Sequence, residues 1–326
     1  MAVGVACRGP HAAAAPADAG TKSLAAPDAG TGSAPPRQIL QTLPAPPYAY
    51  ELSLENCAGP LRENAKDESA CLFAVRLLGG AQVLDRITLG QAGCGPATPT
   101  PVDRTLGADR EATAFSTSDD RCEIDVAART VELGANTTAL LVTELQGFEY
   151  RHRSHALFLA RPSKLETAWS YADDYLGMHW STTSVIPAAQ QGSRAQDIAF
   201  VDTERTTEGV AAQVRATRLH FDSASGVLGD KPLPDADASL FVLVVGNFKN
   251  ADETQAARQH CVHDLEVLRA RLFPKLRLPA FFLGAVFARR DDAADSLAQL
   301  ASCPKAQKGT ILESGISGGK SHGGHH

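Results

Sequence analysis

The sequence predicts two folded regions: a mainly β region over 48–230, built as a sandwich or barrel, and a smaller α+β unit over 239–314. Short runs of alternating apolar and polar residues, separated by turn signals such as Gly79-Gly80, are typical of strands and fill the first region. After Pro232 and Pro234 the pattern changes, and apolar runs alternate with helical segments. A chain of 326 residues is long enough for two such domains.

The alternating runs of the first region place its strands. The candidate strands are Tyr48–Leu54, Cys71–Leu78, Val83–Leu89, Cys122–Val131, Ala139–Leu145, His155–Ala160, Glu166–Tyr171, Asp197–Val201 and Val214–Phe221. The stretches 55–68 and 95–110 lack this alternation and are expected to form long loops.

The second region has the order β-α-β-β-α-β. Its expected elements are a strand at Leu240–Val245, a helix at Ala251–Val262, strands at Leu265–Leu272 and Ala280–Phe287, a helix at Arg290–Ser302 and a strand at Ala306–Leu312. Asn250 is a suitable N-cap for the first helix, and Leu297 and Leu300 are expected to face the sheet from the second. This order predicts a ferredoxin-like fold, in which an antiparallel sheet lies under two helices.

The unit from Ser239 to Ser314 resembles a SPOR domain, the bacterial module that binds peptidoglycan glycan strands stripped of their peptides. The resemblance is based on a strand-Gly-x-Phe-helix phrase, VLVVGNFKN, at Val242–Asn250, with a second copy at Phe281–Phe287. It implies glycan binding on the sheet face opposite the helices. The candidate glycan-binding residues are Asn247, Arg269, Arg271 and Phe282.

The first strand of this unit differs from the family pattern. The family commonly has Gln two residues before the glycine, where this chain has Val244. Leu240–Val245 is apolar on both faces, and a strand of that kind is normally covered on both. The glycan face is therefore expected either to be open or to pack against the β-rich region.

Both ends of the chain are low in packing residues. Residues 8–47 are rich in Ala, Pro and Gly and predict a disordered linker, and the Gly-, Ser- and His-rich tail 315–326 predicts a disordered end. Small and apolar residues precede Cys7, which resembles the processing site of bacterial lipoproteins. We therefore interpret residues 1–7 as the remnant of an export signal, with Cys7 as the lipid attachment site and membrane contact through that anchor only.

The other cysteines favour an oxidising compartment. Beyond Cys7 an even number remains, and none form a CxxC motif. Cys261 and Cys303, at the ends of the two expected helices, are predicted to form a disulfide. Cys57, Cys71, Cys94 and Cys122 are predicted to form two more, in any of three connectivities, and the alternative is a cytosolic protein with buried thiols.

The candidate catalytic and metal-binding patterns are weak. His152 and His155 lie in an expected strand, where residues three apart point to opposite faces, and a solvated strand edge is expected for them. Asp173 and Asp174 with His179 are expected in a turn. Four aromatic residues gather within a dozen positions and are expected to pack in the core, with a sugar-binding groove as the alternative: Trp169, Tyr171, Tyr175 and Trp180. No nucleophile elbow, P-loop or dinucleotide fingerprint is present, so we predict neither catalytic residues, nor a metal site, nor a cofactor.

These observations predict an exported, non-enzymatic bacterial protein, periplasmic or at the cell surface, most simply an outer-membrane lipoprotein. A net charge of -6 argues against nucleic acid as a partner. We expect an interaction or structural subunit of an envelope assembly, with envelope proteins as partners. The alternatives are a peptidoglycan-binding protein that uses the SPOR-like unit, and an enzyme with an unrecognised site in the β-rich region.

Overall fold

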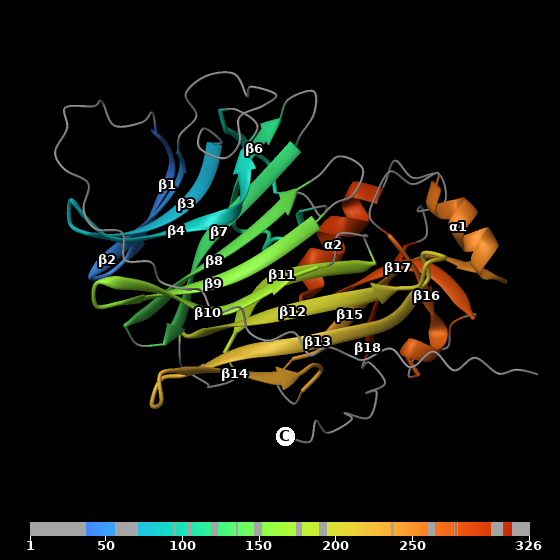
Figure 1. The fold of residues 1–326 in the computed structure, drawn as a ribbon. Coiled ribbons are helices and arrows are strands. Elements are labelled where there is room, and N and C mark those ends of the chain that lie inside the picture. The colour runs from blue at the N-terminus through green and yellow to red at the C-terminus, as the bar shows by residue number, and fades with distance from the viewer. Residues whose placement is uncertain are drawn as a thin grey trace, which may run out of the picture. The chain divides into compact units, whose positions relative to one another are not determined.

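A computed structural model describes most of the chain after residue 36. The described residues are 37–55, 71–93, 96–102, 106–118, 123–134, 136–146, 152–173, 178–188, 194–235, 238–259, 265–274, 276, 278, 280–300 and 309–314. All of them belong to one compact unit, Pro35–His326, and they form mainly antiparallel β-structure (Figure 1).

The first two sheets are meanders of consecutive antiparallel strands. Sheet A contains β1 (Arg37–Ala45), β2 (Tyr48–Glu55), β3 (Cys71–Gly79) and β4 (Gln82–Gly93). Sheet B contains β5 (Thr98–Thr100), β6 (Thr113–Ser118), β7 (Glu123–Gly134), β8 (Thr137–Gln146), β9 (His152–Arg161) and β10 (Lys164–Ala172). β10 is an edge strand of sheet B, and β9 lies between β8 and β10.

The third sheet is again a meander, and the fourth has crossover connections. Sheet C contains β11 (His179–Pro187), β12 (Gln196–Arg205), β13 (Ala211–Asp222) and β14 (Val227–Pro232). Sheet D, in the order β16-β17-β15-β18, contains β15 (Leu240–Phe248), β16 (Glu266–Arg269), β17 (Phe281–Phe287) and β18 (Thr310–Ser314). Helix α1 (Ala251–Gln259) follows β15 and helix α2 (Arg290–Gln299) follows β17.

Hydrophobic clusters join the sheets in the order A, B, C, D. Leu140 and Val142 of β8 pack with sheet A, whereas Leu141 of the same strand packs with sheet C. In β12, Ile198 packs with sheet B and Val201 with sheet D. Alternate residues of one strand thus enter different cores, as the two-residue period of a strand requires. Sheets B and C are therefore each covered on both faces.

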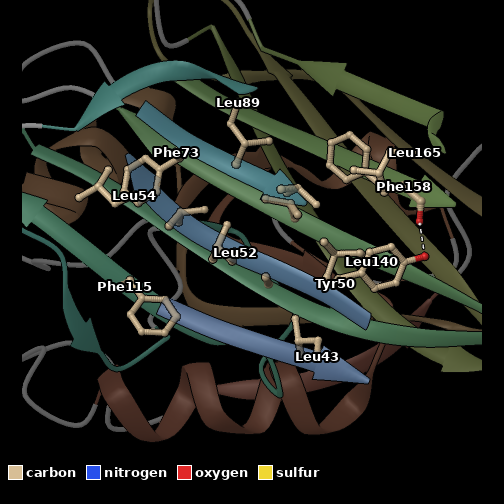
Figure 2. Packing of buried hydrophobic residues seen from close by; sticks show 14 of the residues in the cluster. Leu43, Tyr50, Leu52, Leu54, Phe73, Leu89, Phe115, Leu140, Phe158 and Leu165 are labelled. Carbon is tan, nitrogen blue, oxygen red and sulfur yellow. Dashed lines mark hydrogen bonds between the residues drawn. The ribbon is translucent and has the colours of Figure 1, made fainter. Parts of the chain in front are cut away.

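The core between sheets A and B is shown in Figure 2. Tyr50, Leu52 and Leu54 of β2 are fully buried and face the strands of sheet B. The Tyr50 hydroxyl donates to the carbonyl oxygen of Thr138 at 2.8 Å and accepts from the Ala160 amide at 3.0 Å. Burial raises the pKa of the Tyr50 phenol to about 12, so it remains a donor.

All the strands expected from alternation coincide with strands of the structure, and the structure contains several further strands that were not expected. The expected linker 8–47 extends too far, because Arg37–Ala45 forms β1 by pairing with β2. The expected loop 95–110 contains β5, and the expected turn around His179 is the start of β11. Residues 8–36, and the tail 315–326, lie outside the described residues.

The C-terminal elements follow the expected order with shifted ends. Asn250 caps α1, because its side-chain oxygen accepts from the Glu253 amide at 2.9 Å. The expected strand Leu265–Leu272 is shorter: β16 ends at Arg269, and Ala270–Leu272 forms a 3-10 turn. β18 begins at Thr310 rather than Ala306, and residues 301–308 lie outside the described part. Leu297 and Leu300 of α2 pack on the sheet as predicted.

Candidate functional site: an aromatic groove beside a buried polar layer

The space between sheets B and C changes from apolar to polar along the strands. At one end it is filled by a hydrophobic cluster that includes Leu157 and Ile198. At the other end His155 of β9 lies between two hydroxyls. Its Nδ1 is 2.8 Å from the Thr143 oxygen and its Nε2 is 3.1 Å from the Ser181 oxygen. We call Thr143, His155, Ser181 and Thr183 the polar layer.

His155 is held in its neutral form. The residue is only 1% exposed, and burial, assisted by the nearby Arg153 guanidinium, lowers its pKa well below the usual value. Both ring nitrogens have hydroxyl partners, which can serve as donor or acceptor for either tautomer. His155 is therefore a structural histidine in the interior of the molecule, and the expected solvated strand edge is wrong for it, since β9 is an interior strand.

Arg153 closes one end of the polar layer. Its Nε donates to the Leu106 carbonyl at 2.9 Å, and its guanidinium carbon lies 4.2 Å from the centroid of the Trp180 ring. Its backbone amide donates to Asp173 at 2.5 Å. Burial raises the pKa of Asp173, against the effect of this hydrogen bond and of the Arg153 charge. These contacts fix the positions of the buried side chains of Arg153, Asp173 and Trp180, which therefore have a structural role.

A groove opens beside the polar layer, where sheet C extends past the edge strand β10. It has a volume of about 340 Å³. Its lining includes Trp169, Tyr171, Phe200, Asp202, Arg215 and Asp230. Pockets that bind small molecules have volumes of about 300–1,000 Å³ and combine apolar walls with a few polar groups, and the groove fits this description.

Phe200 is the centre of the aromatic wall. Its ring centroid lies 4.6 Å from that of Tyr171 and 5.2 Å from that of Trp169, and the rings are inclined rather than stacked. Phe200 is buried, whereas Trp169 and Tyr171 are only partly buried and border the groove. Inclined aromatic contacts of this kind are favourable and fix the ring positions.

Asp202 fixes the polar end of the groove. Its carboxylate accepts from the Tyr171 hydroxyl at 3.0 Å and lies 3.1 Å from His179 Nδ1. Burial and the adjacent carboxylate raise the pKa of the Tyr171 phenol, which therefore remains a hydrogen-bond donor. The Tyr171 ring thus packs against Phe200 at an inclined angle while its hydroxyl is held by Asp202.

The aromatic residues that cluster in the sequence do not all lie in the groove. Trp169 and Tyr171 share the groove, Trp180 stacks under Arg153 instead, and Tyr175 lies outside the described residues. His179 pairs with Asp202 rather than with Asp173, and Asp174 lies outside the described residues. His152 is 3.4 Å from Asp173. Phe200 and Asp202 are brought to the site by sheet pairing and were missed, since no local pattern marks them.

The candidate glycan-binding residues of sheet D do not form one surface. Phe282 is fully buried and packs against Phe273, so its ring is not accessible to a sugar. Arg269 lies near the Phe281 ring, at 5.8 Å, and Arg271 is exposed in the following 3-10 turn. The side chain of Asn247 lies outside the described residues.

The cysteine predictions also fall outside what the structure describes. This holds for the lipid site, Cys7, and for five of the six disulfide candidates, Cys57, Cys94, Cys122, Cys261 and Cys303. Cys71 begins β3, but its side chain is not described.

Within the described part of the chain, no cluster of three or more His, Cys, Asp or Glu side chains is arranged to hold a metal ion. No helix there is long and apolar enough to span a membrane. Comparisons with protein-family models, curated proteins and solved structures found no match to this chain.

Proposed function

We propose that this chain is a non-enzymatic protein of the bacterial envelope, acting as an interaction or structural subunit of an envelope assembly, with residues 239–314 as an internal scaffold. The observation that carries this proposal is the burial of the helix-free face of sheet D. Val242 is fully buried and Val244 is 6% exposed. Both pack with Val201 and Ala216 of sheet C. The face that the family resemblance assigns to glycan is thus covered by the chain's own β-sheet.

Polar contacts reinforce this docking. Arg205 at the end of β12 forms an ion pair with Glu266 of β16, and both side chains are largely buried. Ser184 of β11 donates to Asp292 of α2 at 2.7 Å. Hydrogen-bonded partners on both sides of a seam specify one docking geometry, which favours a scaffold over a separately mobile binding module.

The topology of sheet D supports the finer part of the proposal, a ferredoxin-like unit of the SPOR kind. Its strands are antiparallel in the order β16-β17-β15-β18, and α1 and α2 each contact β15 and β17. The cluster under the helices includes Leu243, Val245 and Phe287, and the opposite face contributes Val244 to the core with sheet C. In this proposal the SPOR-like fold packs against sheet C and does not bind glycan.

The envelope location is supported by the sequence alone. Cys7 as a lipid anchor, and the remaining cysteines as disulfides, favour the periplasm or the cell surface, with attachment to the outer membrane. Mass spectrometry of protein purified from its own cells tests this directly. We expect a lipid adduct at Cys7 and oxidised thiols elsewhere; unmodified Cys7 together with free thiols would contradict the location.

Substitution of Val244 by Gln tests the scaffold role. A buried amide without partners costs about 1–3 kcal/mol of stability, in addition to strain from its larger size. The matched control is Val227→Gln, the same substitution at a β14 position that is 60% exposed. Urea unfolding is expected to show a clear loss for Val244→Gln and little change for Val227→Gln. Equal, small effects of the two substitutions would refute a buried face.

A second measurement distinguishes the scaffold role from the alternative, in which the C-terminal unit binds peptidoglycan. The exposed Arg271 is its accessible candidate. The scaffold proposal expects the full chain and its Arg271→Ala variant to be retained equally on peptide-stripped glycan strands. Weaker retention of the variant would favour the alternative.

A further inference from the structure

The aromatic wall of the groove depends on a β-bulge in β10. The register of β10 against β9 shifts between Thr167 and Trp169. Leu165, before the shift, packs in the core with sheet A. In a regular strand Trp169 and Tyr171 would follow Leu165 at intervals of two and face sheet A as well. The shift instead places Trp169 opposite Leu157, which faces sheet C. Bulges that redirect side chains in this way are frequent beside functional sites.

The redirected residues meet a surface of sheet C that β10 does not cover. β10 is an edge strand, and the groove floor comes from β12, β13 and β14. Asp230 of β14 lies opposite Leu219 of β13, on the face that contributes Leu219 to the core with sheet B. Its carboxylate is exposed at the rim. The groove therefore has aromatic rings on one side and an exposed polar rim on the other.

We propose that this groove binds a neutral pyranose sugar, as a single unit of a glycan chain. The C–H face of a pyranose ring is apolar and stacks on an aromatic ring, while its hydroxyls need donors and acceptors around the edge. Trp169 supplies the platform, and Asp230 and Arg215 supply an acceptor and a donor at the rim. The rigid Phe200–Tyr171–Asp202 contacts hold the wall in place before the ligand arrives.

The charges that line the groove favour a neutral ligand. Asp202 and Asp230 are acidic, and Arg215 is the basic residue of the lining. Arg215 is also 3.2 Å from Glu204, which lowers its attraction for an anion. An anionic sugar would therefore meet excess negative charge, whereas sugar hydroxyls bond equally well to carboxylate and guanidinium groups.

Calorimetric titration of the full chain with chitotriose, cellotriose and maltotriose tests the proposal, with trigalacturonic acid as the anionic comparison. We expect saturable binding of at least one neutral trisaccharide and weaker binding of the anionic one. Trp169→Ala is expected to reduce affinity about tenfold, the loss of one stacking contact. Ile39→Ala, at a position of sheet A that is 51% exposed, is the control and is expected to bind like the parent chain.

A second variant decides the outcome if Trp169→Ala fails to fold. Asp230→Leu keeps the whole aromatic wall, removes the acceptor at the rim and narrows the groove at an exposed strand position. We expect it to melt like the parent chain and to bind severalfold more weakly. The proposal is overturned if no neutral trisaccharide binds, if trigalacturonic acid binds more tightly, or if Asp230→Leu binds like the parent. The scaffold role of sheet D does not depend on these results, since Val244→Gln tests it separately.

Discussion

Glu144 is a buried carboxyl group that has no cationic partner among the described residues, and its burial predicts how stability depends on pH. It lies in β8 on the face that also carries Leu140 and Val142, and it is 5% exposed. Its Oε2 accepts from the Ser154 hydroxyl at 3.5 Å, and its Oε1 has no hydrogen-bond partner among the described residues. Burial raises the pKa of Glu144 from 4.5 to about 7, against a smaller opposing effect of Ser154.

This raised pKa makes folding weaker as the pH rises. Below about pH 4.5 the carboxyl is protonated in both the folded and the unfolded chain and contributes no pH dependence. Between about pH 4.5 and 7 the folded chain keeps the proton and the unfolded chain loses it, so stability falls with pH. Above about pH 7 the carboxyl is ionised in both the folded and the unfolded chain, and the stability loss due to this group is complete. At about 1.4 kcal/mol for each pKa unit, the full effect is on the order of 3 kcal/mol.

Glu144→Gln removes this titration and keeps the size of the side chain. We expect the variant to gain stability relative to the parent chain as the pH rises from 4.5 to 8, by up to about 3 kcal/mol. Urea unfolding followed by circular dichroism at several pH values gives the difference directly. Asp292, whose pKa burial raises to about 6, is present in both proteins and cancels in that difference.

The control is Glu132→Gln on the neighbouring strand β7, where the side chain is exposed. Its difference from the parent chain is expected to stay near zero at every pH. The reasoning would be refuted if Glu144→Gln and the parent differed by the same amount at pH 4.5 and 8, or if the variant became relatively weaker at high pH.

Two further predictions concern the bulge and the helix cap. Deletion of Ala168 removes the extra residue of the bulge and makes β10 regular while Trp169 stays opposite Leu157 on the side of sheet C, so we expect the tryptophan emission to remain like that of the parent chain; a shifted emission would argue against the bulge. Asn250→Ala removes the hydrogen bond to the Glu253 amide and is expected to cost about 1 kcal/mol in urea unfolding, whereas Asn250→Asp, which keeps the acceptor, should cost much less.

Much of the fold could be predicted from the sequence because alternation is a local signal. Strands such as Ala139–Leu145 and Val214–Phe221 carry enough apolar residues to be recognised whatever they pair with. β11 was missed for the opposite reason. It is rich in Ser and Thr, and Ser181 and Thr183 belong to the polar layer, so no apolar alternation marks it. β1 was missed because its Pro- and Ala-rich surroundings suggested a linker.

The groove was only half predictable. The clustering of Trp169 and Tyr171 indicated a possible sugar site, but the residues that complete it come from β12 to β14 by long-range packing. The bulge also hides the correct face, because counting by two from Leu165 assigns Trp169 to the wrong side of the sheet. A single inserted residue thus separates the correct interpretation from the incorrect one.

Strands that are buried on both faces connect the C-terminal unit with the groove. Leu240–Val245 is apolar on both faces, which predicts that both faces are buried. Val244 packs against sheet C, and Val245 packs under the helices.

The two faces of β12 differ in the same way, and this difference explains the position of the groove. Its face toward sheet D stays apolar at Ala199 and Val201. Its face toward sheet B changes from Ile198 through Phe200 to Asp202. A polar residue that interrupts only one face of such a strand costs stability unless it has partners, and Asp202 has them in Tyr171 and His179. The groove therefore lies where one face of a doubly buried strand stops being required for packing, while the opposite face continues to hold the C-terminal unit in place.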